Sequence, residues 1–152
     1  MKVVINNCYG GFGLSNLAIK ELATLNGKEC SFFKKKGFDG YYIPITLEEA
    51  NKEFIAIAFS VPNPNELLKK PTKSRSIEEN KKFNDVYRQI SLNSRPDDRG
   101  DKNLITVVEK LGKASCGKYS ELKIIEIPDD VSYDIDEYDG IESIHEKHKS
   151  WN

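Results

Sequence analysis

The sequence predicts an α+β fold, as a single domain over residues 1–152 with a mixed sheet, two or three helices and a C-terminal β-hairpin. Three observations favour this class. Short apolar runs typical of strands occur between amphipathic patterns typical of helices. Their order is too irregular for a doubly wound sheet, although the first strand, loop and helix would fit one. The length of 152 residues suffices for one buried core.

The N-terminal half begins with a predicted strand and a predicted helix. The apolar run at 2–5 indicates a buried strand, and Ser15 can cap a helix that ends at Asn26-Gly27. A capping-box pattern at Thr46 and Glu49 predicts one further helical turn. We expect extended segments at 30–33, 41–45 and 54–59, the second of them at a sheet edge because it contains a proline, and a basic turn at 34–40.

The second half opens with an expected internal loop. Residues 61–75 are polar and contain three prolines. A second capping box, at Ser76 and Glu79, begins a helix whose apolar stripe extends to Ile90. We then expect a helix at 104–111 that ends at Gly112. A strand at 122–127, a turn at 128–130 and a half-buried strand at 131–136 should follow. Asp139-Gly140 predicts a tight turn, and residues 141–148 suit a helix or a final strand.

Charge and composition exclude several classes of protein. The chain has 23 basic and 24 acidic residues and a net charge of −1, which argues against non-specific binding to nucleic acid. No apolar run approaches the roughly 18 residues of a membrane span, and the N-terminus turns polar too early for a signal peptide. We therefore expect no membrane association and a cytoplasmic location. Cys8, Cys30 and Cys116 are widely spaced, which suits free thiols in a reducing compartment.

A glycine-rich loop between the first strand and the first helix is the leading candidate site. Glycines let a ligand approach the backbone closely, and a helix N-terminus attracts anions. The pattern is not a Walker loop, and it lacks the third glycine of a dinucleotide fingerprint. A tight turn that packs the helix on the strand is an equally good interpretation. The loop residues that we predict to bind a ligand are Asn7, Cys8, Gly10, Gly11, Gly13 and Ser15.

All four arginines of the chain lie in its middle, in the basic region 69–99. Arginine binds phosphate through two parallel hydrogen bonds, so this region and the glycine loop could together enclose a nucleotide-like anion. We add Arg88 and Arg95 to the predicted ligand-binding residues. The alternative is an ordinary charged loop and helix.

Three further patterns, two of them near the C-terminus, each have a functional and a simpler structural interpretation. On a helix, Glu142, His145 and Glu146 would share a face, with His148 three residues beyond His145. Such a face could hold a metal, but the ligand set is incomplete, and we predict no metal or other cofactor. The acidic run 134–142 suits a solvated strand edge, or a surface that mimics nucleic acid. Cys8 could act as a nucleophile with a histidine as base, but no complete catalytic constellation is present, so we predict no catalytic residue.

Two stretches of the chain resemble small proteins encoded by tailed bacteriophages and prophages. They are MKVVINNCYGGFGLS at 1–15 and LKIIEIPDDVSYDIDEYDGIESIHEKHKSW at 122–151, and the helix that ends VVEKLG at 107–112 is similar too. The resemblance covers about half of the chain and implies a phage origin without a mechanism.

From the resemblance and the loop together we expect a phage accessory protein that counters host defence. It would bind a host factor, either an anionic small molecule such as a nucleotide-like signal or a host defence protein, in the cytoplasm of the bacterial host. One alternative is an inhibitor that binds a host enzyme through the acidic C-terminal surface. Another is a small Cys/His enzyme. The oligomeric state is left open.

Overall fold

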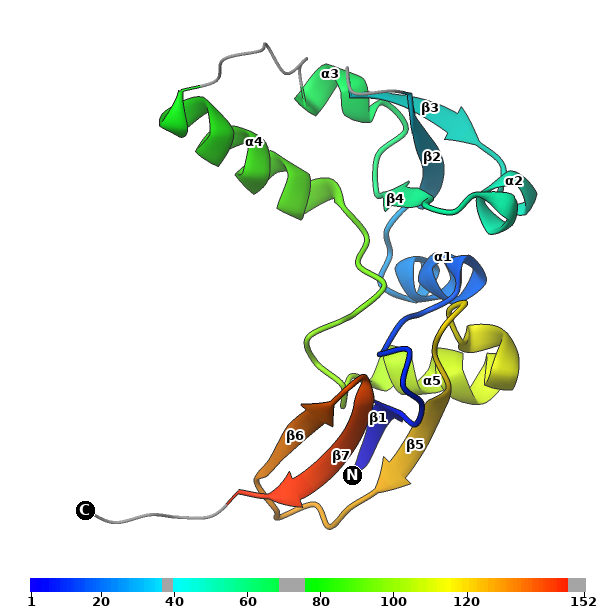
Figure 1. Ribbon diagram of the computed structural model, residues 1–152, viewed down its shortest axis with the longest axis vertical. Helices are drawn as coiled ribbons and strands as arrows, with labels where there is room; N and C mark the ends of the chain where they lie inside the picture. The colour runs from blue at the N-terminus through cyan, green and yellow to red at the C-terminus, as the bar shows by residue number, and fades with distance from the viewer. Residues whose placement is uncertain (37–39, 69–75, 148–152) are drawn as a thin grey trace. The chain divides into compact units, whose positions relative to one another are not determined.

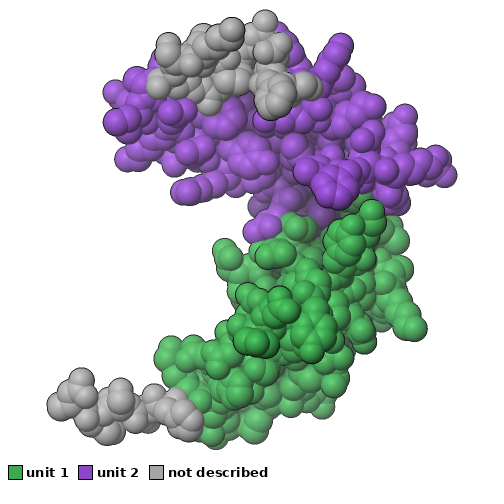
Figure 2. Space-filling model, viewed as in Figure 1, with its two compact units in different colours: residues 1–18, 94–152 green, residues 19–93 purple. Residues whose placement is uncertain are grey.

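The computed structural model describes residues 1–36, 40–68 and 76–147. It confirms the α+β class and the C-terminal hairpin. The chain forms two compact units (Figure 2), which are described separately below. Unit 1 comprises Met1–Ala18 and Ser94–Asn152, and unit 2 comprises Ile19–Asn93. No helix within the described ranges is long and apolar enough to cross a membrane.

Unit 1 contains two short antiparallel sheets of two strands each (Figure 1). β1 (Lys2–Asn6) pairs with β5 (Leu122–Glu126), so the N-terminal segment and a segment of the last quarter of the chain are joined by backbone hydrogen bonds. α5 (Lys102–Leu111) packs on this pair, and its Leu104 and Val107 are buried, as are Val3 and Val4 of β1. A short 3₁₀ helix, η1 (Gly112–Ser115), follows α5.

The second sheet of unit 1 is the hairpin of β6 (Tyr133–Tyr138) and β7 (Ile141–Glu146). Asp139 and Gly140 form its two-residue turn, with φ of +50° and +90°. Positive φ at both central residues matches the twist of antiparallel strands, which explains why Asp-Gly was a correct turn signal. The prediction that 141–148 forms a helix or a strand is thereby decided for 141–146 in favour of a strand, while His148 lies outside the described residues.

In unit 2, three antiparallel strands lie in the order β3 (Tyr41–Ile45), β2 (Ser31–Lys36) and β4 (Ile57–Phe59). The edge position of β3 was predicted from Pro44, which cannot donate a ladder hydrogen bond. The expected basic turn at 34–40 was wrong in its first part, because the lysines at 34–36 continue β2; residues 37–39 lie outside the described part.

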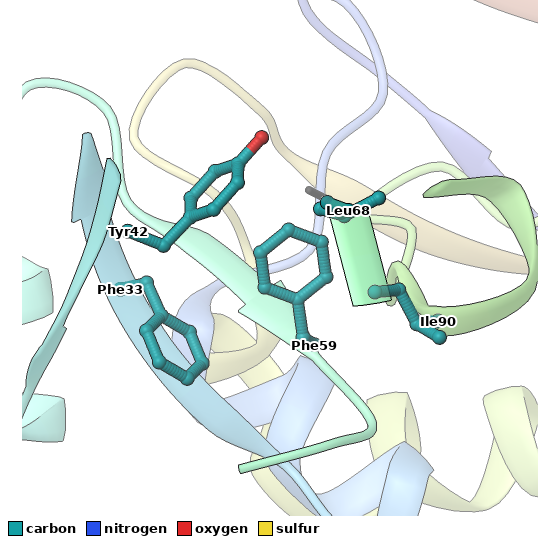
Figure 3. Packing of buried hydrophobic residues seen from close by; sticks show 5 residues of the cluster. All are labelled: Phe33, Tyr42, Phe59, Leu68 and Ile90. Atoms are coloured by element: carbon teal, nitrogen blue, oxygen red, sulfur yellow. The ribbon is translucent and has the colours of Figure 1, made fainter. Parts of the chain in front are cut away.

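The core of unit 2 is aromatic. Figure 3 shows the rings of Phe33, Tyr42 and Phe59 beside Leu68 and Ile90. The Tyr42 and Phe59 rings meet edge to face with centroids 5.0 Å apart, a geometry that adds about 0.5–1.5 kcal/mol to the burial of their apolar area. The predicted apolar stripe of the helix that ends at Ile90 therefore does contribute to a core.

The helices of the chain are more numerous than expected. The described residues contain five α-helices, where two or three were predicted, because α2 (Leu47–Lys52) and α3 (Pro64–Leu68) are short. α3 corrects the expected loop at 61–75, of which 69–75 lies outside the described residues. α1 (Asn16–Leu25) follows Ser15 and α4 (Ile77–Ile90) follows Ser76, as predicted. The predicted capping boxes at Thr46, before α2, and at Ser76, before α4, both form.

The expected mixed sheet was wrong for the described strands. Every strand pair among them is antiparallel, and they make three small sheets. The strand expected at 54–59 is shorter, and Phe54 and Ile55 are exposed. An apolar run by itself does not tell which strand will be its neighbour, so the sheet type could not follow from it.

Candidate anion-binding pocket in unit 1

A buried asparagine holds the glycine loop in place. Asn6, at the end of β1, is fully buried, and its side-chain amide donates to the carbonyl oxygens of Cys8 and Gly140, both at 2.6 Å. Its side-chain oxygen accepts from the Glu121 N–H at 2.8 Å. One side chain therefore joins the loop, the hairpin turn and the start of β5.

Two glycines allow the loop to pack against other backbone. A Cβ on Gly140 would lie 2.5 Å from the Gly11 nitrogen and would also overlap the Tyr9 carbonyl. A Cβ on Gly10 would overlap the Tyr119 carbonyl. Such approaches leave no room for a side chain, so these glycines serve close packing, as the tight-turn interpretation of the loop expected.

A pocket of about 270 Å³ opens where the loop meets the hairpin. Three parts of unit 1 line it. They are residues 9–12 of the loop, the guanidinium groups of Arg95 and Arg99, and four residues of the hairpin, Glu137, Asp139, Gly140 and Glu142. We refer to this site as the Arg95–Arg99 pocket.

Arg99 is fixed from two sides. Its guanidinium carbon lies 3.4 Å from the centre of the Phe12 ring, and its Nη2 lies 3.2 Å from Glu142 Oε1. The other carboxylate oxygen of Glu142 accepts the Asn6 N–H at 2.8 Å. The side chains of Arg99 and Glu142 are only 14% and 8% exposed, so this is a desolvated ion pair with a cation–π contact.

One end of the Arg99 guanidinium is left without a partner. Its Nη1 is buried and makes no hydrogen bond to any described residue. Burial lowers the pKa of Arg99, and the nearby positive charge of Arg95 lowers it further, while Glu142 and Asp97 oppose the shift. A buried donor without an acceptor is costly, so an oxyanion at this position would be stabilised.

Arg95 lies over the backbone of Gly11. Its Nη2 would be 3.3 Å from a Cβ at that position, where φ is +81°. The absence of a side chain at Gly11 therefore provides room for the guanidinium. Two arginines at one pocket present several donors in planar forks, the arrangement that suits phosphate.

The hairpin adds negative charge to the same pocket. One carboxylate oxygen of Glu137 accepts the Gly140 N–H at 2.7 Å. Asp139, in the hairpin turn, is exposed. Counted over the lining, two guanidinium groups stand against three carboxylates, one of which is already paired with Arg99. The pocket is therefore lined by both basic and acidic side chains.

Of the predicted ligand-binding residues, the structure brings Gly10, Gly11 and Arg95 to this pocket. The other four loop residues have contacts within the fold. The Asn7 N–H donates to the Glu121 carbonyl, and the Cys8 thiol donates to Asn6 and Tyr119. The Gly13 carbonyl accepts hydrogen bonds from Gly117 and Ser120. The Ser15 hydroxyl donates to the Ala114 carbonyl and accepts the Ala18 N–H near the start of α1. Arg88 is on α4 in unit 2 and does not line this pocket.

Sequence reasoning missed Asn6, Phe12 and Glu142 as parts of this site and left Arg99 out of the predicted set. An aromatic residue within a glycine loop was the available signal for Phe12, because large apolar side chains seldom occur in a solvated turn. Glu142 was predicted only as a metal ligand on a helix or as part of a solvated acidic edge, and neither interpretation expected it to be buried.

The helical metal face was wrong because the segment is a strand. Residues 142 and 145 then point to opposite faces of β7. His145 Nε2 lies 2.9 Å from Ser143 Oγ and 3.7 Å from Asp136 Oδ2 on the exposed face of the hairpin, away from the partners of Cys8. The described residues contain no group of three or more His, Cys, Asp or Glu side chains that could hold a metal.

A scan against models of known protein families, together with searches of curated proteins and of solved structures, found no match.

Proposed function

We propose that this protein is a phage accessory protein that counters a host defence by binding a nucleotide-like signalling molecule in the Arg95–Arg99 pocket. The observation that carries the binding proposal is the pair of guanidinium groups in one pocket, one of which has a buried nitrogen without a partner. The resemblance to phage proteins supports the biological role.

The size of the pocket suits part of a nucleotide. Pockets that enclose a whole drug-sized molecule typically measure about 300–1,000 Å³. At about 270 Å³, this one would hold a phosphate and its sugar, and the base would remain outside. Tyr9, which is 71% exposed at the edge of the pocket, offers an aromatic face on which a base could stack.

The two segments that carry the phage resemblance meet at this pocket. Residues 9–12 belong to the N-terminal segment, and the hairpin residues from Glu137 to Glu142 belong to the C-terminal one. The contacts of Asn6 with Gly140 and Glu142 join the two segments. That both segments contribute to the pocket supports the proposal that it is the functional site of unit 1.

A ligand screen tests the binding proposal. Thermal shift followed by calorimetry would be run with cyclic nucleotides and with ADP-ribose-type nucleotides. A ligand at 100 times its dissociation constant stabilises the folded chain by about 2.7 kcal/mol, which raises the melting temperature by several degrees. If no nucleotide in the screen gives a saturable shift, the small-molecule proposal fails.

Two arginine variants provide a matched comparison. Arg95→Gln removes a charged donor from the pocket and should weaken binding about tenfold to a hundredfold. Arg88→Gln makes the same chemical change in unit 2 and should leave the affinity unchanged. Equal losses in both variants would show that net charge, and not the pocket, determines binding.

The biological role needs a separate assay. Expression of the chain in a bacterium that carries a nucleotide-signalling defence should restore phage plaques, and Arg95→Gln should abolish the effect. Restoration by both forms would favour the alternative of a protein inhibitor, which capture of the chain on an immobilised host enzyme would then examine.

A further inference from the structure

The charges of the Arg95–Arg99 pocket restrict the kind of phosphate that it can accept. Glu142 is already engaged by Arg99 Nη2 and by the Asn6 N–H, so it is unavailable to a ligand. Glu137 and Asp139 of the hairpin line the same pocket as Arg95 and Arg99. An anion that approaches the guanidinium groups therefore also meets the negative charges of Glu137 and Asp139.

The whole lining has one more negative charge than positive. Each additional negative charge on a ligand would increase its attraction to the guanidinium groups but also its repulsion from the carboxylates of Glu137 and Asp139. In a pocket open to solvent, one such unpaired repulsion is enough to weaken binding by about tenfold. A polyphosphate, which must extend its charge over the pocket, is disfavoured.

The carboxylates suit a different part of a ligand. An ionised carboxylate only accepts hydrogen bonds, and a ribose hydroxyl is a donor of matching geometry, as in the acidic residue that binds ribose in dinucleotide-binding proteins. One oxygen of Glu137 is used by the Gly140 N–H, which orients the side chain and leaves the other oxygen to face a ligand.

Resting on the proposed function, we infer that the ligand is a nucleoside phosphodiester with a single negative charge. The phosphodiester lies against Arg95 and Arg99, and a ribose hydroxyl donates to the carboxylate of Glu137 or Asp139. A phosphodiester carries one charge, whereas a terminal phosphate carries about 1.5–2 at neutral pH. The pocket thus selects for a cyclic or internally linked phosphate against a terminal one.

Four probes that share one base test this assignment by calorimetry at one ionic strength. They are 3′,5′-cyclic AMP, its 2′-deoxy analogue, AMP and ATP. We expect cyclic AMP to bind at least about tenfold more tightly than AMP, ATP to bind most weakly, and the 2′-deoxy analogue to lose about tenfold relative to cyclic AMP.

A hairpin variant separates the two effects. Glu137→Gln with Asp139→Asn keeps acceptors for the Gly140 N–H, and asparagine tolerates the positive φ at 139. It should bring AMP close to cyclic AMP in affinity and reduce the discrimination against the 2′-deoxy analogue. The control, Asp134→Asn with Asp136→Asn, changes net charge equally on the other face of β6 and should leave the ranking intact.

The results distinguish this inference from the proposed function. If AMP or ATP binds as tightly as cyclic AMP, the charge selection is refuted while nucleotide binding stands. Equal affinity for cyclic AMP and its 2′-deoxy analogue would refute the hydroxyl contact. If none of the four probes binds and the wider screen is also negative, the proposed function fails with it.

Discussion

Removal of the Glu142 carboxylate should destabilise unit 1 strongly, because this group satisfies two buried donors. In Glu142→Ala, the Arg99 guanidinium would lose the Nη2 contact at 3.2 Å, and the Asn6 N–H would lose its acceptor at 2.8 Å. Arg99 would then be a nearly buried cation in which Nη2 has lost its carboxylate acceptor and Nη1, as in the wild type, has no hydrogen-bond partner among the described residues.

The size of the effect follows from burial. Breaking a buried ion pair by removing one partner costs about 3–5 kcal/mol, and an orphaned buried N–H costs about 1–3 kcal/mol. The two losses share one carboxylate, so they do not simply add. Because the side chains are still 14% and 8% exposed, water can reach them in part, and we expect a loss near the lower end, about 3 kcal/mol.

Urea unfolding followed by far-ultraviolet circular dichroism at pH 7 measures this loss, with the midpoint lowered and the slope unchanged. Glu146→Ala, which removes an exposed carboxylate from the same strand, is the matched control and should stay within about 0.5 kcal/mol of the wild type. Hydrogen exchange should also show faster exchange of the Asn6 amide in Glu142→Ala. If the two variants unfold alike and that amide stays protected, the buried pair does not hold the pocket together.

Three further predictions concern local structure. Gly140→Ala should lower the free energy of unfolding by at least about 2 kcal/mol, because the new Cβ would overlap backbone atoms at a φ of +90°. Gly27→Ala, at a φ of +67° with open space around it, should lower it by about 1 kcal/mol. Urea midpoints of the two variants measure the difference. Ser76→Ala should destabilise α4 by about 1 kcal/mol through loss of its cap, as measured by helical circular dichroism during unfolding. The backbone N–H and the hydroxyl of Thr46 lower the pKa of Glu49. The stability that this capping box contributes is therefore present above about pH 4.3 and is lost as the pH falls through the lower folded pKa. Thr46→Ala removes the hydroxyl and should raise the pKa of Glu49 in a carboxylate NMR titration.

Local signals in the sequence predicted local structure well. The two capping boxes, the Asp139-Gly140 turn and the edge position of Pro44 each depend on backbone chemistry within a few residues. These features form for the same physical reasons in any context, because a hydroxyl at an N-cap or a glycine at positive φ acts on its own segment.

The pocket could be predicted only in part, because its members come from three separated segments. The loop glycines carry a local signal, but the pairing of Arg99 with Glu142 spans 43 residues and depends on how β7 packs beside β1. The choice of strand over helix at 141–146 decided which way Glu142 faces, and its periodicity allowed both. Because the sequence left helix and strand open for this one element, the buried ion pair could not be predicted.

Two-dimensional NMR of the labelled chain during titration with cyclic AMP examines the Arg95–Arg99 pocket itself. We expect saturable shifts of the amides in residues 9–12, 95–99 and 137–142, together with the side-chain resonances of Arg95 and Arg99, and no comparable change elsewhere. Shifts that saturate at other residues, or none with cyclic AMP or any nucleotide of the screen at millimolar concentration, would contradict the assignment of this pocket as the ligand site.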